Sequence, residues 1–180
     1  MSVEDYLAGE LVSEIKSEFL GGEVHAMAGA GNRHNEIATN VTAALSLGLR
    51  GKSCRAFNSD TKIRIGLANQ IRFYYPDAMV VCDQNRDTDS WQDRPVVIVE
   101  VLSESTRRTD LTEKREAYLT TPSLQVLMLV EPDEAIVVAY RRAYSGDFLK
   151  ESYFGVEAIV PLNEVGIDLA LAEVYERIEF

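Results

Sequence analysis

The sequence predicts a mixed α/β fold of the α+β type, in which a mixed β-sheet is flanked by helices. One long segment carries apolar residues at helical spacing, two segments are nearly continuous apolar runs, and helices and strands are interspersed along the chain. The chain has 180 residues, of which 46% are hydrophobic and 26% charged. This composition is typical of globular proteins, and the length favours a single domain over residues 1–180.

The N-terminal half is expected to begin with a short helix and a hairpin. Ser2 can cap the helix, with Asp5 near the capping-box position, and Gly21-Gly22 suits a tight turn between strands. Apolar residues then recur at helical spacing as far as Leu49, and Gly51 follows as a stop signal. The expected elements are a helix at 3–9, hairpin strands at 18–20 and 23–27, a helix at 32–49, and strands at 55–57 and 62–65.

The C-terminal half contains the two apolar runs, 78–82 and 95–102, which are typical of central strands buried on both faces. Asp110 is expected to cap the next helix, with Glu113 at the capping-box position and Pro122 after its end. The remaining expected elements are a helix at 111–120, strands at 124–130, 136–142 and 151–160, and a helix at 168–178.

Charge and cysteine content exclude several classes of protein. The formal net charge of −11 works against indiscriminate binding of nucleic acids. No basic segment precedes an apolar stretch at the N-terminus, and the apolar runs are too short to span a bilayer, so we expect a cytoplasmic protein without a membrane partner. Cys54 and Cys82 lack C-x-x-C spacing. We therefore expect two reduced, buried thiols.

Glu100 is the residue that does not suit its surroundings, because it interrupts the apolar run of its strand. A buried carboxylate needs a cation, a metal ion or a position at the strand end. Asp77 begins the preceding apolar strand, so antiparallel pairing would bring both carboxylates to one end of the sheet. Such a pair suits Mg²⁺ or Mn²⁺, and Lys114 on the following helix could act beside the ion. Alternatively, Glu100 is a structural ion-pair partner of Arg107, Arg108 or Lys114.

These residues, taken with others, resemble a known family. Pro76-Asp77 followed by Glu100 in an apolar strand resembles the PD-(D/E)xK nuclease superfamily, and more closely the restriction-endonuclease-like Uma2 family. The resemblance extends over almost the whole chain. The matching stretches are 18–24, Ala26-Met27-Ala28-Gly29, His34, Ser59-Asp60, Tyr75-Pro76-Asp77, Glu100-Val101-Leu102-Ser103, Asp110, Lys114, Tyr118 and 171–175.

The resemblance implies a restriction-endonuclease-like sheet of four or five strands with a divalent-metal site. Asp77 and Glu100 would hold Mg²⁺ or Mn²⁺, helped by the carbonyl of Val101. The superfamily pattern would put a lysine at position 102, on the same strand face as Glu100, but this chain has Leu102 there. In this branch the lysine is expected from the following helix, which indicates Lys114 as the third catalytic residue.

Supporting residues and a substrate-binding face can also be assigned. The resemblance gives His34 a place near the metal site, although a capping or surface histidine is an equal alternative. Asp60 could support the site or could be a turn residue. Residues 50–72 carry six basic residues against one acidic residue, which could form a phosphate-contacting face or solvated strand edges. The residues expected to contact nucleic acid are Arg55, Lys62, Arg64 and Arg107.

Two functions from different classes follow from these observations. The first is a metal-dependent endonuclease that hydrolyses phosphodiester bonds of nucleic acid, with DNA as the expected substrate. The second is a catalytically silent protein of the same fold that binds nucleic acid or protein as a homodimer, which Leu102 and the acidic surface favour. A homodimer is expected under either function, because twofold dimers are the commonest oligomers.

Overall fold

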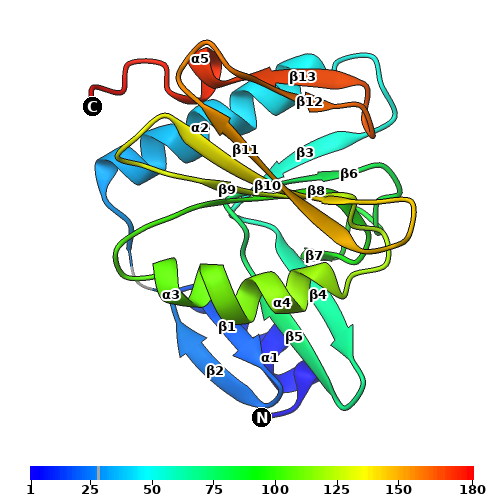
Figure 1. The fold of residues 1–180 in the computed structure, drawn as a ribbon. Coiled ribbons are helices and arrows are strands. Elements are labelled where there is room, and N and C mark those ends of the chain that lie inside the picture. Colours follow the sequence, from blue (N-terminus) through cyan, green and yellow to red (C-terminus); the bar gives the residue numbers. More distant parts are fainter. Residues whose placement is uncertain (28) are drawn as a thin grey trace.

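The computed structural model, in which residues 1–27 and 29–180 are described, is built around a central six-stranded sheet (Figure 1). The strand order is β11-β10-β9-β8-β6-β3, and the β8–β9 pair is parallel while its other neighbouring pairs are antiparallel. The strands are β3 (Arg55–Asn58), β6 (Ala78–Val81), β8 (Pro95–Val101), β9 (Val126–Val130), β10 (Ile136–Arg142) and β11 (Phe148–Phe154).

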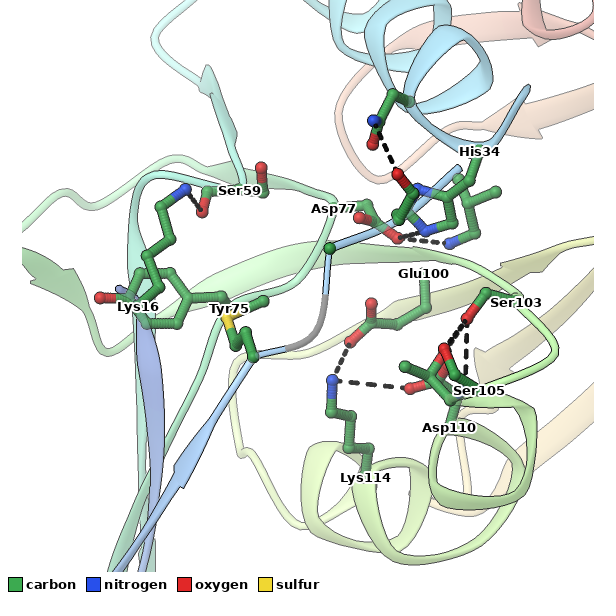
Figure 2. Close-up of a pocket in the computed structure, with 16 residues that line it drawn as sticks. Lys16, His34, Ser59, Tyr75, Asp77, Glu100, Ser103, Ser105, Asp110 and Lys114 are labelled. Atoms are coloured by element: carbon green, nitrogen blue, oxygen red, sulfur yellow. Dashed lines mark hydrogen bonds and ion pairs between the residues drawn. The ribbon is translucent and has the colours of Figure 1, made fainter. Parts of the chain in front are cut away.

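One face of this sheet is covered by the long helix α2 (Asn32–Gly48) (Figure 1). Ile37, Val41 and Leu45 repeat every four residues along α2 and are fully buried against sheet residues that include Val99. The hairpin of β12 (Ile159–Leu162) and β13 (Ile167–Ala170), with the short helix α5 (Leu171–Val174), completes this layer. The N-terminal turn of α2 lies near the point where β6 begins and β8 ends, beside the candidate site (Figure 2).

The opposite face carries a continuous helical segment and a second sheet (Figure 1). The helical segment consists of α3 (Arg107–Thr109), a π-helical turn, η1 (Asp110–Lys114), and α4 (Arg115–Leu119). The second sheet has the order β2-β1-β5-β4-β7. The elements of this part are α1 (Val3–Glu10), β1 (Ser17–Leu20), β2 (Glu23–Ala26), β4 (Lys62–Leu67), β5 (Gln70–Tyr74) and β7 (Trp91–Gln92).

The predicted fold class is confirmed, as are the first helix, the N-terminal hairpin and the two apolar central strands. Ser2 caps α1 as expected, because its hydroxyl accepts a hydrogen bond of 3.1 Å from the N–H of Asp5. The strands β5 and β7 were not predicted from the sequence. No helix in the described part of the chain has both the length and the apolar character needed to cross a membrane.

Three local predictions are wrong. Asp110 does not cap the start of the helical segment, because this segment already begins at Arg107 and Asp110 lies inside it. The helix predicted at 168–178 is instead the end of β13 followed by the four-residue helix α5. The strand predicted at 151–160 is divided between β11 and β12 by a turn at Gly155.

The expectation of two reduced thiols is also wrong, because Cys54 and Cys82 form a disulfide. The strand register explains why these residues meet although they are 28 positions apart. Arg55 of β3 pairs with Val81 of β6 in antiparallel fashion, so the residue before one strand faces the residue after the other. The sequence alone does not reveal this pairing, because the register of β3 against β6 is set by packing.

Candidate active site

Glu100 lies near the end of β8 with its side chain directed at the helical segment on the second face of the sheet (Figure 2). The residue is only 3% exposed, and its Oε1 accepts a hydrogen bond of 2.5 Å from the hydroxyl of Tyr118 on α4. Burial raises the pKa of Glu100 well above its ordinary value, although the Lys114 ammonium opposes this. Asp77 and Asp110 raise it further because their charges repel an ionised Glu100.

Asp77 immediately precedes β6 and lies beside Glu100. Ala78 of β6 pairs with Val99 of β8, and extending this antiparallel register by one residue places Asp77 opposite Glu100. The Val101 N–H donates a 2.7 Å hydrogen bond to Asp77 Oδ2, and His34 Nε2 lies 3.3 Å from the same oxygen (Figure 2). Burial opposes protonation of His34, but contact with Asp77, together with smaller contributions from Asn35 and the Val101 backbone, outweighs burial and raises the His34 pKa.

Lys114 lies on η1 and supplies the ammonium of the site. Its Nζ lies 2.8 Å from Glu18 Oε1, 3.5 Å from Asp110 Oδ1 and 3.7 Å from Glu100 Oε1. The residue is 6% exposed. Burial alone would lower the pKa of Lys114, but the three carboxylates outweigh burial and raise it. Lys114 is therefore a protonated cation at neutral pH.

The cluster contains more acidic than basic side chains. Glu18, Asp77, Glu100 and Asp110 face one ammonium and one imidazole. Asp110 Oδ1 is buried and accepts no hydrogen bond from any side chain or backbone group in the described ranges. Burial raises the pKa of Asp110, and the neighbouring charge of Asp77 adds to this effect. Since ionising all four carboxylates is unfavourable here, an additional cation would relieve the repulsion.

Of these residues, all but Glu18 line a cavity of about 310 Å³; they are His34, Asp77, Glu100, Asp110 and Lys114. Its walls come from the α2 N-terminus, the ends of β6 and β8, the loop after β8, and η1. Across residues 1–27 and 29–180, no group of three or more His, Cys, Asp or Glu side chains is arranged to hold a metal ion. Mg²⁺, however, usually takes only one or two protein carboxylates and completes its coordination with waters and phosphates. The oxygen atoms of Asp77 and Glu100 fit that mode of binding.

Val101 and Leu102 lie on opposite faces of the strand end. Val101 borders the cavity, and its N–H orients Asp77. Leu102 is buried in the apolar cluster that also contains Ile98 and Tyr118. Leu102 is therefore part of the core, whereas Lys114 on the following helix lines the cavity.

The four basic residues expected to contact nucleic acid do not gather at the cavity; the described residues that line it include none of them. The prediction that Lys62 contacts nucleic acid is wrong, because Lys62 is 4% exposed and donates a 2.9 Å hydrogen bond to the hydroxyl of Tyr75. Arg64 and Arg107 are held by Asp93 and Glu131 respectively, each through two hydrogen bonds, while Arg55 is exposed on the edge strand β3.

Asp60 is an exposed residue of the turn between β3 and β4, where its carboxylate pairs with Lys16. Two contributions were missed from the sequence. Glu18 was assigned to a hairpin strand and Asp110 to a helix cap, and both were quoted in the family resemblance, but neither was given a role in the site; both contact Lys114. The four-residue spacing of Asp110 and Lys114 was a usable signal, because residues at i and i+4 share a helix face. Ala28 of the sequence motif lies outside the described residues.

A carboxylate pair at adjacent strand ends, completed by a lysine from the next helix and carried on a mixed sheet flanked by helices, defines a restriction-endonuclease-like protein. The chain belongs to the Uma2 family, whose model matches residues 3–172 and is described as "Putative restriction endonuclease". Members of this class of fold generally use divalent metal ions.

The chain is also similar to curated relatives and to a solved structure. The chain is 30% identical to the uncharacterized protein slr1290 of Synechocystis sp., over 100% of this chain and 94% of the relative. It is 31% identical to the uncharacterized protein sll1609 of the same organism, over 91% and 93%. The crystal structure of "a putative nuclease belonging to DUF820" from Anabaena variabilis has a similar fold, with a TM-score of 0.71, 20% identity and 91% coverage of each chain.

Proposed function

We propose that this chain is a divalent-metal-dependent endonuclease that hydrolyses phosphodiester bonds of DNA. The observation that carries the proposal is the approach of Asp77, Glu100 and Lys114 to one cavity that is rich in acidic side chains. Membership of the Uma2 family supports the same reaction class. Asp77 and Glu100 would hold Mg²⁺ or Mn²⁺ together with the Val101 carbonyl. A bound ion of this kind would activate water and offset charge on the phosphate.

The remaining residues hold this arrangement in place. The Val101 N–H and His34 fix the orientation of Asp77, leaving its carboxylate turned toward the cavity. Tyr118 holds one oxygen of Glu100. Such supporting contacts matter because ligands bind metal well only when their orientation is set beforehand.

Lys114 acts as a positive charge and hydrogen-bond donor in this proposal. Three carboxylates keep it protonated, so it is unsuited to removing a proton from water. An ammonium beside the reacting phosphate stabilises the negative charge that develops during phosphoryl transfer. Glu18 makes the shortest of the three contacts with this ammonium and restrains its position.

The test begins with Mn²⁺ binding by isothermal calorimetry on the wild type, Glu100→Gln and Asp77→Asn. Asp133→Asn is the matched control, because Asp133 is an exposed carboxylate that pairs with Arg33 outside the cavity. We expect binding by the wild type and the control, and none by the two cavity variants. Cleavage of plasmid and linear DNA in Mg²⁺ or Mn²⁺ should follow the same pattern.

The opposite result has a definite meaning. If the wild type binds no metal and cleaves no nucleic acid, or if Glu100→Gln cleaves as fast as the wild type, the proposed chemistry is wrong. The first of these outcomes would favour the silent homodimeric binding protein, which sedimentation analysis would then test.

A further inference from the structure

Lys16 is a basic residue at the cavity that the catalytic arrangement does not use. It immediately precedes β1, and its backbone carbonyl accepts a 2.9 Å hydrogen bond from the Met27 N–H. The side chain extends to the β3–β4 turn, where its Nζ donates a 3.0 Å hydrogen bond to the Ser59 carbonyl (Figure 2). The Lys16 ammonium also pairs with the carboxylate of Asp60. The ammonium also lies 5.6 Å from the ring centroid of Tyr75.

The position of Lys16 is distinctive because of its exposure. The basic side chains among the described residues lining the cavity are Lys16, His34 and Lys114. Lys114 is enclosed by three carboxylates, and His34 is mostly buried against Asp77. The Lys16 side chain is 42% exposed. A phosphate that approaches this cavity from solvent therefore meets Lys16 as its accessible cation.

A nucleic-acid strand needs such a cation here. The cavity carries several carboxylates, and each phosphodiester adds a negative charge, so electrostatic repulsion opposes binding. Exposed ion pairs such as Lys16–Asp60 contribute little stability. Exchanging Asp60 for a phosphate oxygen would therefore sacrifice little, and the Ser59 carbonyl and the Tyr75 ring would keep the ammonium at the cavity mouth.

We propose that Lys16 binds a backbone phosphate of the nucleic-acid substrate at the mouth of the cavity, and that Asp60 competes with the phosphate for this ammonium. The inference rests on the proposed function for the identity of the substrate. It extends that function by assigning a substrate-binding residue and a competing carboxylate outside the catalytic arrangement. The contact is made to the backbone, so it is independent of base sequence.

The competing explanation is that Lys16 only ties the N-terminal hairpin to the β3–β4 turn. The two explanations predict different effects of Asp60→Asn on DNA binding. If Lys16 is a tether, Lys16→Met and Asp60→Asn both loosen it and neither strengthens DNA binding. If Lys16 binds phosphate, Lys16→Met weakens DNA binding, whereas Asp60→Asn frees the ammonium and strengthens it.

The experiment measures binding of a fluorescein-labelled DNA duplex by fluorescence anisotropy. The titrations are carried out in Ca²⁺ at a series of NaCl concentrations. The length of the duplex is checked after each titration to show that it has not been cleaved. For Lys16→Met we expect about tenfold weaker binding at low salt. The slope of log affinity against log salt should become shallower by about 0.9, the value for one phosphate contact. Asp60→Asn should bind more tightly than the wild type. Lys150→Met, which removes an exposed lysine of β11, is the matched control and should bind as the wild type does.

The inference is overturned if Lys16→Met keeps the wild-type affinity and salt slope, if Asp60→Asn binds more weakly than the wild type, or if the wild type does not bind the duplex. Metal calorimetry and cleavage by the wild type separate this failure from failure of the proposed function. A wild type that binds Mn²⁺ and cleaves DNA, with Lys16→Met unchanged in DNA affinity, would refute only the role of Lys16.

Discussion

Glu100→Gln should raise the stability of the metal-free protein while removing its response to metal. Glutamine has nearly the shape of glutamate and can still accept the hydrogen bond from Tyr118. It removes one of the carboxylates that crowd Lys114. Because burial raises the pKa of Glu100, its ionisation opposes folding once the pH exceeds the ordinary value of a glutamate. The gain should therefore be present at pH 8 and much smaller near pH 4, where Glu100 is mostly protonated in both the folded and the unfolded state.

The expected shifts in melting temperature can be worked out from the chain length. At about 2.1 cal/mol/K per residue, unfolding 180 residues carries an entropy of about 380 cal/mol/K. Each unit by which the Glu100 pKa is raised is equivalent to about 1.4 kcal/mol, which is roughly 4 °C. Metal at about 100 times its Kd stabilises the wild type by about 2.7 kcal/mol, or roughly 7 °C.

The assay is thermal unfolding followed by circular dichroism, at pH 8 and pH 4, in EDTA and in MnCl₂. Asp133→Asn again serves as the control, and it should behave as the wild type in every condition. The reasoning fails if Glu100→Gln melts below the wild type in EDTA at pH 8. It also fails if Mn²⁺ raises the melting temperature of both proteins equally, because Glu100 would then contribute nothing to the metal site.

Three further changes have calculable outcomes. Replacing Cys54 and Cys82 by serine opens a loop of 28 residues and should lower the free energy of unfolding by about 3.5 kcal/mol in urea; dithiothreitol should reproduce this loss in the wild type and leave the variant unchanged. Lys114→Met should abolish cleavage and destabilise the protein by about 3–5 kcal/mol at pH 8. The loss should be smaller at pH 5, because the carboxylates become protonated. If urea unfolding gives the same difference between variant and wild type at both pH values, the ion-pair cluster is contradicted. Ile37→Ala should cost about 2–5 kcal/mol by leaving a cavity under α2, measured in urea, and a loss below 1 kcal/mol would contradict the packing.

The central strands of the sheet could be predicted because their apolar composition reflects burial on both faces. The runs 78–82 and 95–102 are apolar at nearly every position, and only strands with two covered faces need that pattern. The same pattern made Glu100 conspicuous. The strand β5 was missed although Ile71 and Phe73 alternate with polar residues, because its two-residue separation from β4 was not recognised as a hairpin turn.

The C-terminal helix was predicted wrongly for a physical reason. Apolar residues at 167, 169 and 171 follow the spacing of a strand, while those at 171, 174 and 175 follow the spacing of a helix. The sequence cannot say where one pattern gives way to the other. In the structure the pairing of β13 with β12 decides it, and the helix is left with only four residues.

The residues of the candidate site likewise include some that the sequence predicts and some that it does not. Asp77 and Glu100 could be found because each interrupts or begins an apolar strand. Lys62 was misplaced because lysine is usually exposed, whereas here Tyr75 and Glu10 surround its ammonium inside the protein. The contact of Glu18 with Lys114 joins positions 96 residues apart on different elements, and no local spacing predicts such a meeting.

The π-helical turn η1 makes this part of the chain sensitive to changes in length. Asp110, Lys114 and Tyr118 all contact Glu100 or one another, and each is four residues from the next. In a regular α-helix a spacing of four overshoots a full turn by about 40°, so three such residues drift by about 80°. The wider turn at 110–114 takes up part of this drift. Deletion of one residue would turn either Lys114 away from the cavity or Tyr118 out of the core. Natural variation should therefore conserve the number of residues between Glu100 and Tyr118.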